Sequence, residues 1–172
     1  MALASLLAAC GGPTPTPTSS PTPAKTVVKD GPFQLTFELP GSTWKAGDAI
    51  TGQATLVLTQ GDTAALSGSN SILGFEFAEV GGDRHTQVVW TAACGQYTLL
   101  ASKPMTSDIV KTGAYQGDAP PGDFNREFLT DPLVRLPVGR WDITAIALFS
   151  ESLDCSGPSH EMNATVRVTV TE

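Results

Sequence analysis

The 172-residue sequence lacks the features by which nucleic-acid-binding and membrane-spanning proteins are recognised. Its ten Lys and Arg are scattered singly among seventeen Asp and Glu, so no basic stripe is available to neutralise a phosphate backbone. No apolar run approaches the roughly 20 residues that a membrane-spanning helix needs. The composition therefore argues against nucleic-acid binding, and we interpret the net charge of −7 as a feature that favours solubility.

Motifs of catalysis and metal binding are also missing. The sequence contains no G-x-S-x-G elbow, no H-E-x-x-H motif and no glycine-rich phosphate loop. Its two histidines, His85 and His160, lie far apart and have no metal ligand at a characteristic spacing. We therefore expect both to be surface histidines in loops. We predict that the protein is not an enzyme and uses no cofactor or metal.

Only three cysteines are present, and the first of them follows a short apolar run. Leu7 to Cys10, with the sequence LAAC, resembles the lipobox of bacterial lipoproteins. The resemblance implies cleavage before Cys10, acylation of this residue, and anchoring at the extracytoplasmic face of a cell-envelope membrane, because several acyl chains together anchor stably. No Lys or Arg precedes Cys10, whereas secretory signals begin with basic residues, so we expect translation to start upstream of Met1. The alternative is an N-terminus with a chance cysteine.

A segment rich in Pro and Thr follows this cysteine. Five prolines alternate with Thr and Ser, and no large apolar residue lies among them. Such a composition cannot bury a core and favours an extended polyproline II tether. We therefore predict three parts: residues 1–10 as signal remnant and lipobox, residues 11–26 as tether, and residues 27–172 as a folded domain.

The remainder of the chain alternates apolar and polar residues with a period of two, which is typical of half-buried strands. The segments with this pattern are 33–39, 50–58, 73–79, 86–92, 141–149 and 162–170. Clusters of Gly, Pro, Asp and Ser separate them, and no segment of the folded part shows a sustained 3.6-residue period. About seven to nine short strands over this length predict an all-β fold, a two-sheet antiparallel sandwich rather than a barrel.

Two stretches resemble bacterial Ig-like domains. Residues 43–58, TWKAGDAITGQATLVL, are similar to the A–B region of those domains, and residues 136–149, LPVGRWDITAIALF, are similar to their E–F corner and F strand. Trp141 stands where those domains usually have a Tyr whose hydroxyl bonds back to the backbone. The resemblance spans residues 30–172 and implies an Ig-like sandwich, and it implies no activity.

The two remaining cysteines, Cys94 and Cys155, form an even pair in an oxidising compartment. Each follows an expected strand and lies in a loop that contains Gly or Ser. We predict a disulfide that ties these loops together, with an upper limit of about 4 kcal/mol from chain entropy. Two separate free thiols are the alternative.

Four residues are candidates for a binding surface. Trp44 lies in an expected loop, where an exposed indole can stack on a sugar ring or anchor a partner, although we favour packing against the sandwich. Asp118 and Asp123 belong to the unusual insertion 115–131, whose carboxylates could offer oxygen ligands to Ca²⁺, although we favour a solvated connector. His85 is the fourth. Trp90 and Trp141 lie on expected strands and are interpreted as core.

Two functions from different classes remain open. The favoured one is a membrane-anchored lipoprotein whose non-catalytic Ig-like domain binds an envelope or extracellular protein or glycan, and a protease-inhibitor-like sandwich is a related version. The alternative is a metal-handling or enzymatic domain with a site assembled from loops around His85, His160 and residues 118–131. Convergence of these groups in one pocket would favour the alternative.

Overall fold

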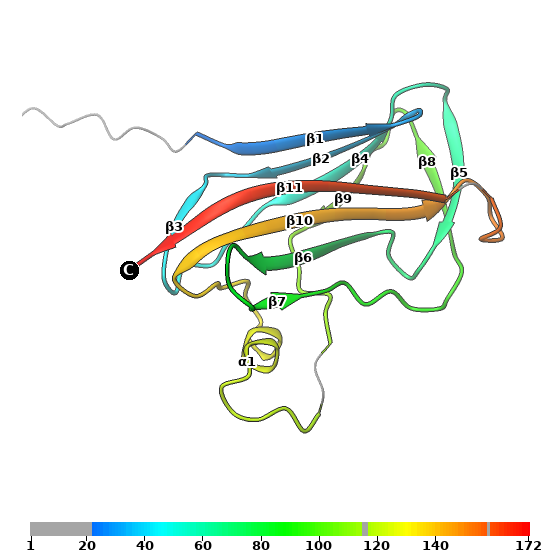
Figure 1. Cartoon of the computed structure of the whole chain (residues 1–172). Helices are drawn as coiled ribbons and strands as arrows, with labels where there is room; N and C mark the ends of the chain where they lie inside the picture. Colours follow the sequence, from blue (N-terminus) through cyan, green and yellow to red (C-terminus); the bar gives the residue numbers. More distant parts are fainter. Residues whose placement is uncertain (1–21, 115–116, 158) are drawn as a thin grey trace, which may run out of the picture.

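The computed structural model describes residues 22–114, 117–157 and 159–172, which fold into strands and one short helix (Figure 1). The elements in chain order are β1 (Ala24–Asp30), β2 (Phe33–Leu39), β3 (Thr43–Lys45), β4 (Gln53–Leu58), β5 (Thr63–Gly68), β6 (Leu73–Glu79), β7 (His85–Thr86), β8 (Gly95–Leu100), β9 (Met105–Asp108), α1 (Phe124–Thr130), β10 (Gly139–Ser150) and β11 (Ser159–Thr171). Cys10 and most of the expected tether lie outside the described residues. β1 begins at Ala24, inside the range expected to be tether.

The strands form two sheets that pack face to face. The first has the order β1-β2-β4-β9, and every pair in it is antiparallel. The second has the path β3-β11-β10-β5-β8, with β6 also paired to β10 and β7 to β6. β1, β2 and β4 lie above β11, β10 and β6 in Figure 1. The predicted all-β sandwich is confirmed. The described residues form eleven strands, two more than the upper end of the expected range, and two of them, β3 and β7, have only three and two residues. The β3–β11 pair is parallel.

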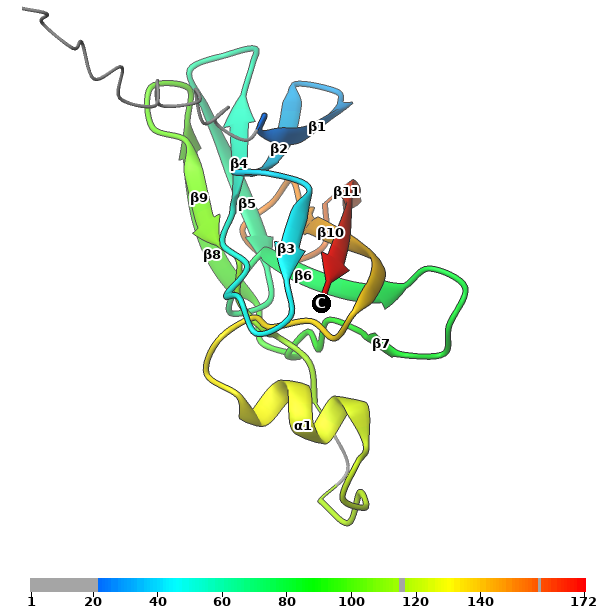
Figure 2. The same ribbon diagram turned by 90° about the vertical axis from the view of Figure 1, so that its left-hand side faces the viewer.

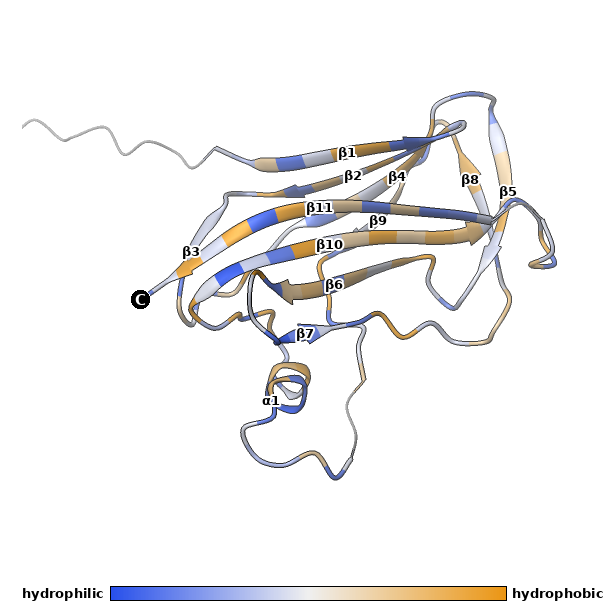
Figure 3. Cartoon of the chain, in the orientation of Figure 1, coloured by the Kyte–Doolittle hydropathy of each residue, from blue (hydrophilic) through white to orange (hydrophobic). Residues whose placement is uncertain are grey.

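The core lies between the sheets and is built by the period-two alternation. In β2, the side chains of Phe33, Leu35, Phe37 and Leu39 are all fully buried, and those between them face outward. β10 pairs with β11 on one side and with β6 on the other, so it is central in its sheet and buries residues of both faces in its second half. Figure 3 shows the same strand as hydrophilic at its start and hydrophobic beyond.

Trp141 occupies the corner that the Ig-like resemblance assigns to a tyrosine. Its indole is fully buried, and its Nε1–H donates to the carbonyl oxygen of Pro137 at 2.9 Å. The ring packs against Phe124, with 5.3 Å between the centroids, and the Arg84 guanidinium lies over it at 5.1 Å. An indole N–H thus makes the bond to the preceding backbone that a tyrosine hydroxyl makes in Ig-like domains.

The predicted strand over residues 86–92 is wrong. Only His85 and Thr86 pair with β6, and the residues after them, up to residue 92, belong to no β-ladder. The apolar residues of this segment cover the sheet instead, because a Cβ placed on Gly74 would lie 2.9 Å from Val88 Cγ1 and 3.0 Å from Trp90 Cη2. The alternation of apolar and polar residues in this segment therefore reflects packing of its side chains against the sheet and not hydrogen-bonded pairing with another strand.

The insertion 115–131 is more than a solvated connector, because it contains helix α1 (Figure 2). Asp123 is the N-cap, and its carboxylate accepts the Arg126 backbone N–H at 2.8 Å. Phe128 is buried against Phe77, with 4.9 Å between the ring centroids. Within the described ranges, no helix is long and apolar enough to cross a lipid bilayer.

Candidate functional site

A groove of about 1000 Å³ opens on the outer face of the four-stranded sheet. Its floor is made by outward side chains at the end of β2, the start of β4 and the end of β9, which lie at the same end of the sheet (left in Figure 1). These side chains are Thr36, Glu38, Gln53, Thr55 and Asp108. Register aligns them, because Glu38 is opposite Gln53 and Gln53 is opposite Asp108, so the three form one row across the strands.

The row continues onto β1 and is partly paired within itself. Lys25 is opposite Glu38, and its Nζ lies 3.3 Å from the Glu38 carboxylate. Gln53 Nε2 donates to Asp108 Oδ1 at 3.0 Å. The row therefore alternates donors and acceptors, and both members of the Gln53–Asp108 pair keep further hydrogen-bonding capacity.

The wall of the groove comes from the end of α1 and the loop after it, from the residues that follow β9, and from Pro40 after β2. Its side chains are mainly aliphatic: Pro40, Ile109, Val110, Leu129, Pro132, Leu133 and Val134. Val110 and Leu133 are exposed members of this set, with 46% and 43% of their surfaces accessible. A hydrogen bond of 2.8 Å from the Ile50 N–H to the Val134 carbonyl joins this loop to the segment that leads into β4.

Lys111 connects the wall to the C-terminal end of α1. Its Nζ donates to the carbonyl oxygens of Phe128 and, at 2.8 Å, Asp131, so it satisfies groups at the C-terminal end of α1. The ammonium also lies 4.2 Å from the Phe128 ring centroid. Burial lowers the pKa of Lys111, whereas the nearby Asp131 carboxylate acts in the opposite direction.

Asp131 lines the same wall, and its carboxylate already has partners within the protein. Its Oδ1 accepts the Leu133 N–H at 2.9 Å, and Arg135 Nη1 lies 3.0 Å from Oδ2. The Leu133 N–H, and then the Arg135 guanidinium, hold the pKa of Asp131 below its usual range. The carboxylate is therefore ionised at neutral pH and neutralised by its neighbours.

The floor requires one glycine. A Cβ on Gly52 would lie 2.3 Å from Leu39 Cδ2 and 2.9 Å from the Glu38 carbonyl oxygen. Gly52 also accepts the Ile109 N–H at 2.9 Å, which joins the start of β4 to the wall. Only a residue without a side chain lets the chain before β4 approach β2 this closely.

The four residues predicted as a binding surface do not line this groove. Trp44 lies in β3 rather than in a loop and packs, half-buried, against the core. His85 is exposed in β7, with its Nδ1 3.0 Å from the Asp83 carbonyl oxygen. Asp118 is exposed in the insertion, and the Asp123 carboxylate is used as the cap of α1.

His160 is not the surface loop residue that the sequence predicts. It lies in β11, its side chain is only 12% exposed, and its ring stacks on Phe149 with 5.1 Å between the centroids. Nδ1 lies 2.7 Å from Asp30 Oδ2, and Nε2 lies 2.7 Å from Glu151 Oε1. The arrangement joins β1, β11 and the loop between β10 and β11.

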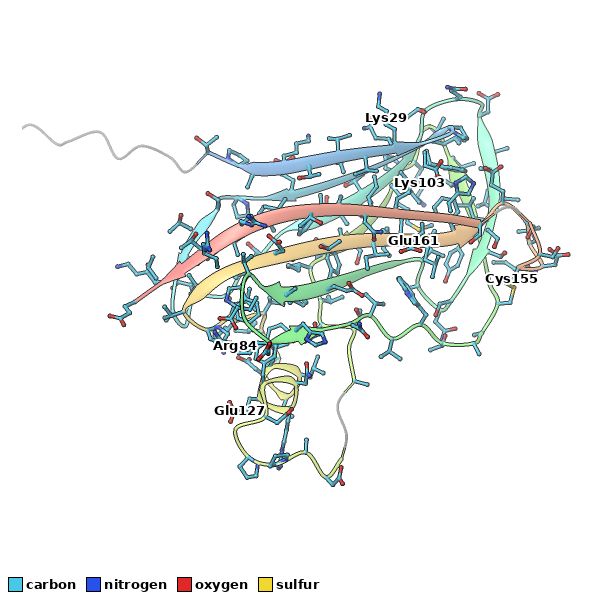
Figure 4. The ribbon with its side chains drawn as sticks, viewed as in Figure 1. Lys29, Arg84, Lys103, Glu127, Cys155 and Glu161 are labelled. Atoms are coloured by element: carbon cyan, nitrogen blue, oxygen red, sulfur yellow. A yellow bond between two sulfur atoms is a disulfide. The ribbon has the colours of Figure 1, made fainter. Side chains whose placement is uncertain are left out.

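The groups expected to assemble a loop-based site, His85, His160 and residues 118–131, are not brought together in the described part of the chain. His160 bonds to Asp30 and Glu151 at the disulfide end of the molecule, whereas β7 and α1 lie below the sheets (Figure 4). In residues 22–114, 117–157 and 159–172, no three His, Cys, Asp or Glu side chains are grouped so as to hold a metal ion.

Cys94 and Cys155 form a disulfide, with 2.11 Å between the sulfurs and 6.1 Å between the Cα atoms. It joins the segment before β8 to the loop between β10 and β11, at the end of the sandwich away from the groove (Figure 4). The Cys155 N–H donates to the buried Ser67 hydroxyl at 3.0 Å. The loop is thus held by a covalent bond and by a hydrogen bond to β5.

The sequence does not reveal the groove, because the polar residues of its floor have the alternating pattern of any solvent-exposed strand face. Thr36 and Glu38 alternate with the buried residues of β2, as the polar side of any half-buried strand does. The pairing of β4 with β9, which brings Asp108 beside Gln53, joins positions 55 residues apart. Comparison with models of known protein families gives no match to this chain, and comparison with curated proteins gives none either.

Proposed function

We propose that the protein is a lipid-anchored extracytoplasmic binding module. In this proposal Cys10 carries the anchor at a membrane of the cell envelope, residues 11–23 serve as the tether, and the non-catalytic Ig-like sandwich binds an envelope or extracellular ligand. The observation that carries the proposal is the groove, which combines aligned polar side chains with an exposed aliphatic wall. The Cys94–Cys155 disulfide supports it, since such bonds persist in oxidising compartments.

The place where the folded domain begins fits this arrangement. Ala24 pairs with Leu39 and Lys25 with Glu38, so β1 starts beside residues that line the groove. At about 3.1 Å per residue, an extended tether from Cys10 would keep the groove within roughly 40–45 Å of the membrane. The module would therefore meet ligands at or near the surface that anchors it.

The test compares the native chain with a Cys10→Ser variant, both expressed from the gene with its upstream sequence. We expect the native protein to fractionate with membranes and to carry acyl chains on Cys10 in mass spectrometry, and the variant to be released. Envelope material cross-linked to the native protein should be lost on a Gln53→Ala/Asp108→Ala variant and kept on Asn163→Ala, a control on the outer face of the other sheet. An unmodified Cys10 would contradict the proposed lipid anchor. Equal capture of envelope material by Gln53→Ala/Asp108→Ala and Asn163→Ala would contradict binding in the groove.

A further inference from the structure

We propose that the groove binds a neutral oligosaccharide. The inference rests on the proposed function, since it names the ligand class of the same groove. It follows from three properties of the described residues: the hydrogen-bonding groups of the floor, the pairing of the charges, and the position of the floor on a sheet face.

The floor offers both donors and acceptors, as a ligand rich in hydroxyl groups requires. Gln53 Nε2 uses one proton on Asp108 Oδ1, which leaves its second proton, its Oε1 and the other Asp108 oxygen. In the part of the chain that the structure describes, the hydroxyls of Thr36, Thr51 and Thr55 make no hydrogen bond to protein. Each hydroxyl can donate and accept, as sugar hydroxyls do.

Every charge that lines the groove except that of Asp108 is matched by a neighbouring group, which disfavours an anionic ligand. Glu38 is paired with Lys25, and Asp131 with Arg135. Lys111 is bound to two carbonyl oxygens and is near Asp131, and Asp108 accepts from the Gln53 amide. An anionic ligand would have to break one of these pairs before it gained a partner.

The shape of the groove favours a sugar over an extended peptide. Its floor is the face of a sheet, where the backbone groups of β2 and β4 are already used in the ladder. A peptide added as a strand takes its affinity from main-chain bonds at a sheet edge, and these are not available on a face. The exposed aliphatic side chains of Val110 and Leu133 instead suit the C–H faces of sugar rings.

The test uses the full chain with Cys10→Ser in solution and a panel of neutral oligosaccharides: maltohexaose, cellohexaose, mannohexaose and tetra-N-acetylchitotetraose. Calorimetry and amide NMR titration measure binding and locate it. We expect at least one sugar to bind and to shift the amide signals of Thr36, Gln53 and Asp108. Gln53→Ala/Asp108→Ala should weaken binding about tenfold or more, since two hydrogen-bonding side chains are lost. Asn163→Ala on the other sheet should change it less than about twofold.

Each other outcome decides against the inference. No shift from any sugar at millimolar concentration overturns it, and so does binding that the double variant leaves unchanged. Tighter binding of hexagalacturonate, a charged oligosaccharide, contradicts the neutral preference. If the double variant does not fold, Leu133→Ser serves in its place, with thermal melting as the check on folding. Capture of a polypeptide by the groove without any sugar binding would leave the proposed function standing and remove this inference.

Discussion

The outer faces of the two sheets have the same period-two polar pattern in the sequence, but they differ in what their polar groups do. On β10 and β11, Arg167 donates two hydrogen bonds to Asp142, at 2.8 and 2.9 Å. Beside this pair, the hydroxyls of Thr144 and Thr165 lie 2.9 Å apart. The polar groups of this face, which we call the closed face, satisfy one another across the strands.

On the four-stranded sheet the corresponding groups are only partly paired. The Gln53–Asp108 pair keeps free donors and acceptors, and the aliphatic wall with Leu133 rises beside it. The comparison teaches that cross-strand pairing turns a polar face into a stabilising surface, whereas incomplete pairing beside a wall leaves a surface for a ligand. Substitutions of polar side chains should therefore reduce stability on the closed face and reduce ligand binding in the groove.

Removal of the disulfide should cause the largest loss of unfolding free energy among the variants. The Cys94→Ser/Cys155→Ser variant should lose about 2–4 kcal/mol of unfolding free energy, because a loop of this length is no longer closed in the unfolded chain. Urea denaturation measures the loss. The disulfide lies at the end of the sandwich away from the groove, so the folded variant should still bind its ligand. Loss of binding at a temperature where the variant is folded would contradict the independence of the groove from the disulfide end.

Gly52→Ala tests the close approach of Gly52 to β2 beneath the groove. The added Cβ would collide with the Leu39 side chain and the Glu38 carbonyl, so we expect a loss of about 1–3 kcal/mol of unfolding free energy, together with weaker ligand binding. The control is Gly117→Ala, because a Cβ at that exposed loop position meets no atom within 4 Å. Equal melting temperatures for the two variants would contradict the close approach at Gly52.

Asp142→Asn tests the closed face. The hydrogen bonds from Arg167 lower the pKa of Asp142 below its ordinary value of 3.8, so the pair contributes stability at pH values above that value and loses it as the pH falls through the folded-state pKa. The pair is partly exposed, so we expect about 0.5 kcal/mol near neutral pH.

Denaturation at pH 7 and at acid pH checks this prediction, with the pH difference between native protein and variant as the readout. The native protein should lose more stability than Asp142→Asn as the pH falls through the acid range. A larger stability difference between the two proteins at acid pH than at pH 7 would have the wrong sign for a carboxylate with a lowered pKa.

Gln53→Ala/Asp108→Ala should have the smallest effect on stability, within about 0.5 kcal/mol, because both side chains are exposed and their bond competes with water. The same variant should show the largest change in ligand affinity. A stability loss equal to that of Gly52→Ala would mean that the row supports the fold rather than a ligand.

Much of the sandwich follows from the sequence, because burial enforces alternation. The segments of β2, β6, β10 and β11 were predicted with the correct inward faces, since a shift of one residue would expose a whole apolar row. The same alternation explains why the strand predicted over residues 86–92 is wrong. Val88 and Trp90 occupy alternate positions because they pack over Gly74, and not because the segment pairs in a sheet. Alternation reports burial on one side and not a hydrogen-bonded partner.

The helix and the groove could not be predicted in this way. α1 has seven residues, which is too short for a 3.6-residue period to appear, although the capping Asp123 and the terminating Pro132 were visible signals. The groove depends on the β4–β9 register and on where Leu133 comes to lie, and both are set by contacts between distant parts of the chain. The candidate residues Trp44 and Asp123 were chosen by type, and the fold uses them for packing and capping.

The most direct test of the groove is a calorimetric titration of three proteins with the oligosaccharide that binds best: the native domain sequence, Gln53→Ala/Asp108→Ala in the groove, and Asp142→Ala/Arg167→Ala on the closed face. We predict that the groove variant loses about tenfold or more in affinity at unchanged stability, whereas the closed-face variant keeps its affinity within about twofold. Equal affinities of all three proteins, or a loss confined to the closed-face variant, would contradict the assignment of the groove as the binding site.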